Sequence, residues 1–211
     1  KIIMKKNFLF FFVHPSKFHV FKKTINHLKE NGHNVEILIT SKDVLEELVK
    51  NEGWSYTNIF PEGRKFKNIS PYISVTVNFF RTIFRLLKYC RNKKYDLFIT
   101  DDLLVYVGKI RRVPTIAFTD DDIAIVRQSS IILKFANYIL APTITDLGKY
   151  NKKKIAFDGY KELAYLHPNQ FTPNLELVKK IIPDKNYFIL ITIKKIFIMQ
   201  FTLDHYLVIK N

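Results

Sequence analysis

The residues best suited to do chemistry are carboxylates that follow two short apolar segments. Asp101 comes directly after the segment 96–100, and Asp120 and Asp121 follow the segment 113–118. Carboxylates crowded together raise one another's proton affinity, which suits acid–base catalysis near neutral pH. We therefore take Asp101, Asp120 and Asp121 as the candidate catalytic residues.

The neighbouring acids also have an ordinary structural explanation. Asp102 and Asp122 follow the same segments, and Asp is common as a helix cap or in a solvated loop at such junctions. A metal site at 120–122 would require three adjacent acids to converge on one ion, although hard cations do take oxygen ligands. No metal ligands are therefore predicted.

A second polar group follows the first apolar run. His14, Ser16, Lys17 and His19 stand at the expected start of a helix. The free N–H groups and partial positive charge at that end of a helix favour a phosphate or a hydroxyl-rich ligand, so these four are candidate substrate-binding residues. In the alternative interpretation, Pro15 ends a strand and Ser16 caps the helix. The fingerprint G-x-G-x-x-G is absent, which argues against a standard dinucleotide site.

These groups need elements that bring them to one place, and apolar runs alternate with segments of helical periodicity. The expected strands are 8–13, 35–40, 54–60, 96–100, 113–118, 138–141 and 155–157, and the expected helices are 17–31, 42–51, 70–88, 103–111 and 123–136. Strands and helices in this order predict an α/β fold, a Rossmann-like doubly wound parallel sheet. Ligands of such sheets bind beyond the carboxyl ends of the strands, where the candidate residues are expected.

Composition limits the class of protein. The chain has 211 residues and a formal net charge of +15, and 47% of its residues are hydrophobic, which is typical of a globular domain. The excess charge attracts nucleic acid, anionic membrane or a phosphorylated ligand, unless it only reflects a lysine-rich solvated surface. No nucleic-acid-binding module is recognisable, so no such partner is predicted. The single cysteine, Cys90, excludes an intramolecular disulfide and is predicted to be a core residue.

The sequence gives two indications of location. No apolar run near the start is long enough to span a bilayer, and no signal-peptide cleavage pattern is present, so we expect a cytoplasmic protein. The helix 75–94 interleaves apolar residues with Arg and Lys, as in helices that lie on an anionic membrane surface. Peripheral contact with the inner face of the membrane therefore stands beside the alternative of a core helix with a charged outer face.

Four segments resemble a known family. They are HPSKFHVFKKTINHLKENGHNVEILITSKDVLEEL (14–48), YDLFITDD (95–102), VPTIAFTDDD (113–122) and FDGYKELAYLHPNQFTPN (157–174). They resemble uncharacterised prokaryotic proteins with a domain of unknown function related to glycosyltransferase-B enzymes and to UDP-N-acetylglucosamine 2-epimerase. The resemblance covers roughly residues 5–190, and its last motif is the most specific.

The resemblance implies two Rossmann-like domains with a cleft between them. The second domain usually holds the nucleotide of the sugar donor, and the first shapes the acceptor side. By motif position, Asp101 and the acids at 120–121 stand near acids of the epimerase-like relatives, and His14 and His19 match the opening motif. Glu162 and Tyr165 match the later motif and are added to the substrate-binding candidates.

The tail departs from the family pattern. We expect a Rossmann-like N-terminal domain at 4–165, an interdomain linker at 166–185, and a truncated or frameshifted start of the second domain at 186–211, because ITIKKIFIMQFTLDHYLVIKN carries no family motif. The chain is thus expected to be the N-terminal half of a glycosyltransferase-B-type fold, with the second domain missing or truncated. Such a chain is expected to be inactive alone.

The implied function is that of an incomplete nucleotide-sugar-dependent glycosyltransferase-like protein of surface polysaccharide synthesis. Its partners would be a nucleotide sugar, bound as substrate, and a sugar or lipid-linked acceptor, with no cofactor. A UDP-sugar 2-epimerase-like isomerase and a non-catalytic truncated remnant are the alternatives. The sequence leaves the sugar, the acceptor and the oligomeric state open.

Overall fold

The computed structural model describes residues 4–41, 44–64 and 71–169, together with 171, 172, 174, 176 and 180. The chain divides into two compact units, Lys1–His167 and Pro168–Asn211, and every element described below lies in the first unit. The expected start of a second domain at 186–211 lies outside the described residues. The domain boundaries therefore stay predictions.

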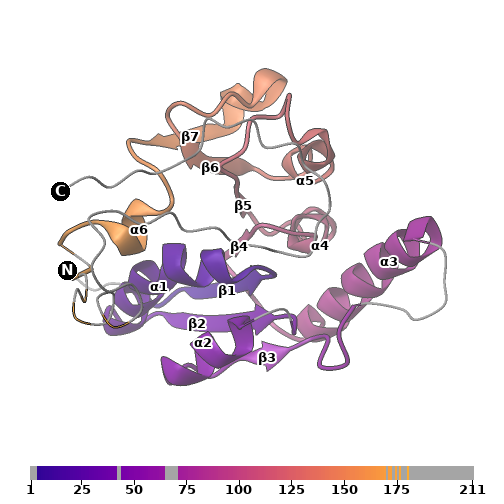
Figure 1. Ribbon diagram of the computed structural model, residues 1–211. Helices are drawn as coiled ribbons and strands as arrows, with labels where there is room; N and C mark the ends of the chain where they lie inside the picture. Colours follow the sequence, from indigo (N-terminus) through magenta and orange to yellow (C-terminus); the bar gives the residue numbers. More distant parts are fainter. Residues whose placement is uncertain are drawn as a thin grey trace. The chain divides into compact units, whose positions relative to one another are not determined.

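The first unit is built on seven parallel strands, whose order in the sheet is β3-β2-β1-β4-β5-β6-β7 (Figure 1). Strand order reverses between β1 and β4, which makes their carboxyl ends the topological switch point, where ligands bind in open α/β sheets. The predicted Rossmann-like parallel fold is confirmed. The strands are β1 Asn7–Phe12, β2 Asn34–Ile39, β3 Thr57–Asn58, β4 Leu97–Thr100, β5 Thr115–Phe118, β6 Tyr138–Pro142 and β7 Lys154–Phe157.

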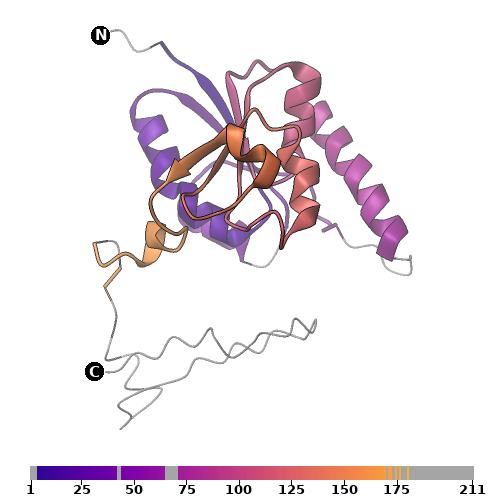
Figure 2. The same ribbon diagram turned by 90° about the horizontal axis from the view of Figure 1, so that it is seen from above.

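Helices cover both faces of this sheet (Figure 2). Alternate residues of β1 divide between the faces: Phe10 and Phe12 pack with side chains of α1 and α2, whereas Leu9 and Phe11 pack with those of α3 and α4. Burial on both faces explains the unbroken apolar run of β1. The helices are α1 Pro15–Glu30, α2 Leu45–Asn51, α3 Pro71–Cys90, α4 Leu104–Arg111, α5 Ser130–Leu133 and α6 Leu163–Leu166, with the 3₁₀ turns η1 Arg127–Ser129 and η2 Gly148–Lys153.

The pairing of β1 with β4 brings together the residues that follow these two strands. Phe8 is opposite Leu97, and Phe11 is opposite Thr100, in a parallel register. Parallel strands end at the same edge of a sheet. The turn that follows β1 and the acids that follow β4 therefore emerge side by side.

The expected helix at 123–136 forms only in the middle of this range. The backbone N–H of Ile123 donates to the carbonyl of Asp146 at 3.0 Å, and Asp122 Oδ1 accepts from the Asp146 backbone N–H at 2.6 Å. Helical structure is limited to η1 and α5, at 127–133. Long-range hydrogen bonds to the turn after β6 therefore override the local periodicity.

The starts of two helices also differ from expectation. Helix α1 begins at Pro15, and His14 rather than Ser16 caps it, because His14 Nδ1 accepts from the Ser16 backbone N–H at 3.2 Å. Helix α2 begins at Leu45, and no side chain caps it. The nearby Ser41 hydroxyl donates to Glu46 Oε2 at 3.3 Å instead.

Cys90 is fully buried against α4, as predicted. Burial raises the pKa of its thiol to about 11, so the group is inert at neutral pH. Of the helices in the described part of the chain, none combines the length and the apolar character needed to cross a bilayer.

Candidate functional site

A pocket of about 170 Å³ lies at the carboxyl edge of the sheet, where β4 and β5 end. Its polar lining comes from parts of the chain that are far apart in sequence: Lys17 from the first turn of α1, Asp101 after β4, and 119–121 after β5. The structure therefore gathers Lys17 and all three predicted catalytic carboxylates around one space.

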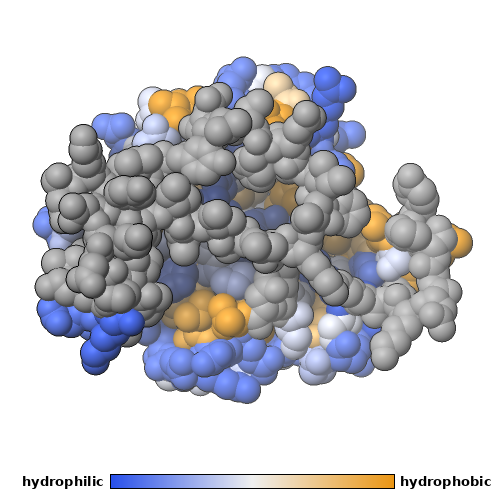
Figure 3. Space-filling model, viewed as in Figure 1, coloured by the Kyte–Doolittle hydropathy of each residue, from blue (hydrophilic) through white to orange (hydrophobic). Residues whose placement is uncertain are grey.

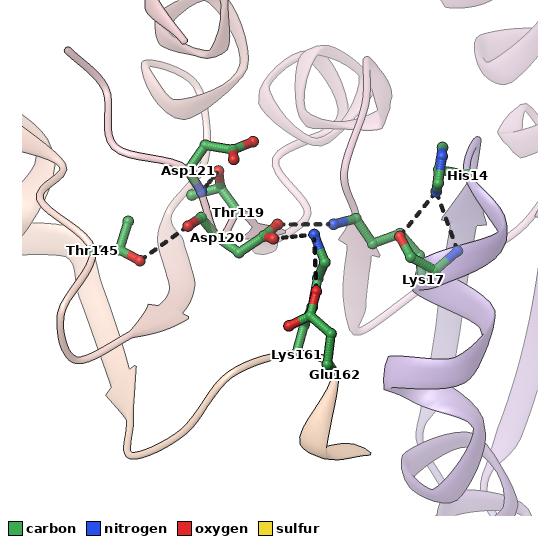
Figure 4. Close-up of polar contacts among 9 residues, drawn as sticks. His14, Lys17, Thr119, Asp120, Asp121, Thr145, Lys161 and Glu162 are labelled. Atoms are coloured by element: carbon green, nitrogen blue, oxygen red, sulfur yellow. Dashed lines mark hydrogen bonds and ion pairs between the residues drawn. The ribbon is translucent and has the colours of Figure 1, made fainter. Parts of the chain in front are cut away.

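Lys17 is the central cation of this pocket. Its side chain is only 10% exposed, and its Nζ lies 3.3 Å from Asp120 Oδ1 (Figure 4). The same ammonium group lies 4.3 Å from the centroid of the Phe118 ring, a cation–π contact. A charge this shielded must be neutralised locally, so Asp120 fixes Lys17 in place.

Asp120 receives a second ion pair from Lys161, which follows β7 and also lies 3.7 Å from Glu162 Oε1. Figure 4 shows Lys17 and Lys161 converging on this carboxylate from different elements. Burial by itself would raise the pKa of Asp120, but the hydrogen bonds and charges of Lys161 and Lys17 outweigh it and hold the pKa below its ordinary value. Asp120 is therefore a stable carboxylate at neutral pH and a weak proton acceptor.

Asp101 has the opposite environment. Its Oδ1 atom is buried, and no hydrogen-bond partner for this atom is found in the described part of the chain. Burial raises the pKa of Asp101 to about 6, with Lys17 lowering it and Asp102 raising it to a lesser extent. A carboxyl group with a pKa near neutrality can both accept and release a proton, as acid–base catalysis requires.

Asp121 and Asp102 take different positions. The backbone N–H of Asp121 donates to Thr119 Oγ1 at 3.4 Å, and its carboxylate points away from the two lysines (Figure 4). Asp102 accepts from the Leu103 backbone N–H at the start of α4 and forms an ion pair with Arg64 at 2.9 Å. Its structural role agrees with the interpretation favoured from the sequence.

The histidine motif splits into two parts. His14 Nδ1 lies 3.0 Å from Ser16 Oγ, and this pair forms the start of α1 rather than the lining of the pocket as the structure describes it. The His19 ring lies 4.9 Å from the ring of Tyr165 in α6, centroid to centroid. Burial, aided by the charge of Lys22, lowers the pKa of His19. His19 and Tyr165 therefore belong to the contact between α1 and α6.

Sequence reasoning missed one residue that pairs with the pocket lining and two that belong to the lining. Lys161 neutralises Asp120, and Thr119 and Ser129 add hydroxyl groups to the lining. Lys161 stands next to Glu162 in the most specific family motif, just after Gly159, so its position was a usable signal. No group of three or more His, Cys, Asp or Glu residues suited to a metal ion occurs among the described residues.

No protein-family model and no curated protein matches this chain. Solved structures do match. The UDP-GlcNAc 2-epimerase from Neisseria meningitidis bound to UDP-GlcNAc has a TM-score of 0.58 and 13% identity, over 84% of this chain and 54% of that one. The glycotransferase of kitacinnamycin has a TM-score of 0.52 and 13% identity, over 82% and 56%. The spinosyn forosaminyltransferase has a TM-score of 0.51 and 13% identity, over 74% of this chain and 51% of that one.

These matches decide the fold. The chain has the fold of one half of a glycosyltransferase-B-type protein. It spans about half the length of the solved structures it matches. Glycosyltransferases and UDP-GlcNAc 2-epimerases share this Rossmann-like half, as the sequence resemblance implied, and at such identities the likeness concerns the fold and not the reaction.

Replacing Asp101 with Asn is expected to change how stability depends on pH. The pKa of Asp101 in the folded chain, about 6, exceeds its ordinary value of 3.8, so the folded state binds the proton more tightly. The free energy of unfolding therefore falls as pH rises from about 4 to about 6. A tenfold difference in proton affinity corresponds to roughly 1.4 kcal/mol. Between pH 4 and pH 6, the free energy of unfolding of Asp101→Asn should therefore rise by about 2–3 kcal/mol relative to that of the wild type. Urea unfolding between pH 4 and pH 8 measures the difference.

Asp96→Asn is the matched control, at the opposite end of β4. The Asn7 backbone N–H and Lys6 lower the pKa of Asp96, so its contribution to stability is lost as pH falls, with the opposite sign. Parallel stability curves for the wild type and Asp101→Asn would show that the carboxyl group is not perturbed as described.

Proposed function

We propose that this chain forms the acceptor side and the reaction site of a nucleotide-sugar-dependent glycosyltransferase. The observation that carries the proposal is Asp101: a carboxyl group with a buried, unpartnered oxygen, in a pocket at the topological switch point, with a pKa near neutrality. Such a group is placed and tuned to take a proton from a bound hydroxyl group.

In the proposed reaction, the acceptor hydroxyl oxygen forms a bond to the anomeric carbon of the donor sugar. The bond from that carbon to the nucleotide diphosphate breaks, and the diphosphate leaves with the electron pair. Asp101 takes the hydroxyl proton, which makes the oxygen a better nucleophile. Asp120 stays ionised between Lys17 and Lys161 and holds the wall of the pocket in place.

The size of the pocket fits part of a substrate. Complete ligand sites typically measure roughly 300–1,000 Å³, whereas this one measures about 170 Å³. The family resemblance assigns the nucleotide of the donor to a second domain, so the proposal places only the reacting hydroxyl group and its sugar ring here. Carboxylate and hydroxyl side chains at 119–121 and Ser129 supply hydrogen-bond partners for sugar hydroxyls.

The same carboxyl group supports a second candidate, a UDP-sugar 2-epimerase-like isomerase. Epimerisation requires a proton to leave one carbon of the sugar and return, and a group with a pKa of about 6 can do both. Product analysis separates the candidates, because a transferase joins two substrates and an epimerase changes one.

We also propose that α3 contacts the cytoplasmic face of a membrane, where surface polysaccharides are built on lipid-linked acceptors. Four side chains at spacings of four, three and four residues form one exposed apolar stripe: Ile73 (57% exposed), Val77 (38%), Phe80 (65%) and Phe84 (67%). Figure 3 shows hydrophobic side chains over α3, on the right of the molecule. Such a stripe on a basic protein suits an anionic lipid surface.

The charges of α3 are arranged differently from the sequence interpretation. Arg81 and Arg85 both form ion pairs with Glu62, at 2.9 and 2.6 Å, and are directed toward the domain. The exposed Lys88 lies four residues after Phe84 on α3, and the exposed Arg91 directly follows the end of the helix. These two residues are the cations proposed to face lipid headgroups.

Titration of the isotope-labelled chain with free mono- and disaccharides as acceptors, and with UDP-, GDP- and CMP-sugars as donors, tests the main proposal. At least one sugar is expected to shift the backbone amide signals of Thr119 and Asp121 saturably. Asp101→Asn should weaken that binding about tenfold or more, the effect of losing a hydrogen bond to a charged group. Asp96→Asn, remote from the pocket, should leave it unchanged. Absence of any shift at the pocket with both sets of ligands would refute the placement of the reacting sugar in this pocket.

Sedimentation with phosphatidylglycerol-containing vesicles tests the membrane contact. The double variant Phe80→Ser/Phe84→Ser should bind at least about tenfold more weakly, because each buried Phe side chain contributes roughly 1.5–3 kcal/mol. Ile144→Ser is the control, since Ile144 is 70% exposed but lies outside α3. Equal binding of both variants, or no binding by the wild type, would exclude α3 as the contact.

A further inference from the structure

A second pocket, of about 460 Å³, lies next to the Asp101 pocket. Helix α3, the start of α4 and the segment η1–α5 line it, and Ile132 lines both pockets. Most of its lining is apolar, including Val75, Phe79, Leu103 and Ile131. A pocket of this size, adjacent to a candidate reaction site, can take the rest of a substrate molecule.

One cation in this second pocket has unused donors. Arg64 Nη1 donates to Asp102 Oδ2 at 2.9 Å, whereas its Nε and Nη2 atoms are buried with no hydrogen-bond partner among the described residues. Buried polar atoms are nearly always paired, so each exception needs an explanation. The ion pair with Asp102 uses only the Nη1 atom of Arg64. It does not explain why the Nε and Nη2 atoms, on the adjacent edge of the guanidinium group, are buried.

The surroundings of Arg64 carry a positive surplus. The guanidinium carbons of Arg64, Arg81 and Arg85 lie 5.4, 5.3 and 4.3 Å from the centroid of the Phe60 ring. Among the residues that the structure describes, two carboxylates pair with these three cations: Asp102 pairs with Arg64, and Glu62 pairs with the other two arginines. The Phe11 ring, 5.8 Å from the Arg64 guanidinium carbon, adds a second aromatic contact. The cluster therefore favours an incoming anion.

We propose that Arg64 is the anion-binding residue of a second ligand site, which takes an oxyanion group carried by an amphiphilic molecule. The Nε and Nη2 donors present two parallel N–H groups, the geometry that binds two oxygens of a carboxylate or phosphate. Because Arg64 lines the pocket with a side chain 25% exposed, a turn of the guanidinium group brings this edge to the ligand. The apolar part of the ligand then lies along Val75, Phe79 and Ile131.

Three probes with the same eight-carbon chain test this site: octyl phosphate, octanoate and the neutral octyl glucoside, each below its micelle concentration. Calorimetry and amide shifts at Val75 and Leu103 report binding to the full chain. At least one anion is expected to bind saturably and at least tenfold more tightly than octyl glucoside. The preferred anion identifies the group as phosphate or carboxylate.

Substitutions of Arg64 distinguish binding by the paired Nε and Nη2 donors from attraction by the positive charge alone. Arg64→Gln should weaken binding of the preferred anion at least tenfold, and Arg64→Lys, which keeps the charge but loses the paired donors, should weaken it by a smaller factor. Arg112→Gln removes an exposed arginine just past the C-terminal end of α4, outside the pocket lining, and should have no effect. Thermal melting checks that each variant is folded. If Arg64→Gln does not fold, the affinity of Arg64→Lys for the anion is the test of the site.

Three results would overturn the proposal: no binding of either anion, equal binding of octyl glucoside, or unchanged affinity in Arg64→Lys together with Arg64→Gln. The proposal does not depend on the transfer reaction, because its shifts map to α3 and the start of α4. The titration with sugars and nucleotide sugars reports at Thr119 and Asp121 instead, so failure of one test is distinguishable from failure of the other.

Discussion

A buried ammonium group holds the candidate site together. Lys17 lies between the ring of Phe118 and the carboxylate of Asp120, with only 10% of its side chain exposed. A buried charged group is stable in a folded protein only when an opposite charge lies next to it. This pairing joins the first turn of α1 to the loop after β5, and Lys161 extends it to the segment after β7. The site therefore depends on contacts across most of the sheet.

The same arrangement gives two carboxylates two different properties. Asp120 is held ionised by Lys161 and Lys17, whereas the burial of Asp101 raises its pKa to about 6. Neighbouring titratable groups whose pKa values are pushed apart are a common feature of acid–base sites. The reversal of strand order between β1 and β4 places Lys17 and Asp101 on the two sides of one crevice. The fold thus provides the geometry, and local electrostatics selects Asp101 as the proton acceptor.

Much of this could be predicted from the sequence, because it follows from local pattern. Alternating apolar runs and helical periodicity predicted the parallel sheet, and the carboxyl-end rule placed Asp101 and Asp120 at one edge. Contacts between distant segments were not predictable in this way. The start of the helix expected at 123–136 gave way to hydrogen bonds with Asp146, and the pairing of Lys161 with Asp120 joins residues 41 positions apart. The lowered pKa of Asp120 follows from its contacts with Lys161 and Lys17, and the raised pKa of Asp101 follows from its burial in the folded chain.

Carbon-13 NMR of the side-chain carboxyl groups tests the central claim most directly. Titration of the labelled chain from pH 3 to pH 9, with the Asp101 signal assigned by its loss in Asp101→Asn, gives the pKa of this group without any ligand or assay. We expect a midpoint at about pH 6 for Asp101 and a midpoint below the ordinary value of 3.8 for Asp120. A midpoint for Asp101 at its ordinary value would contradict the assignment of this residue as the proton acceptor.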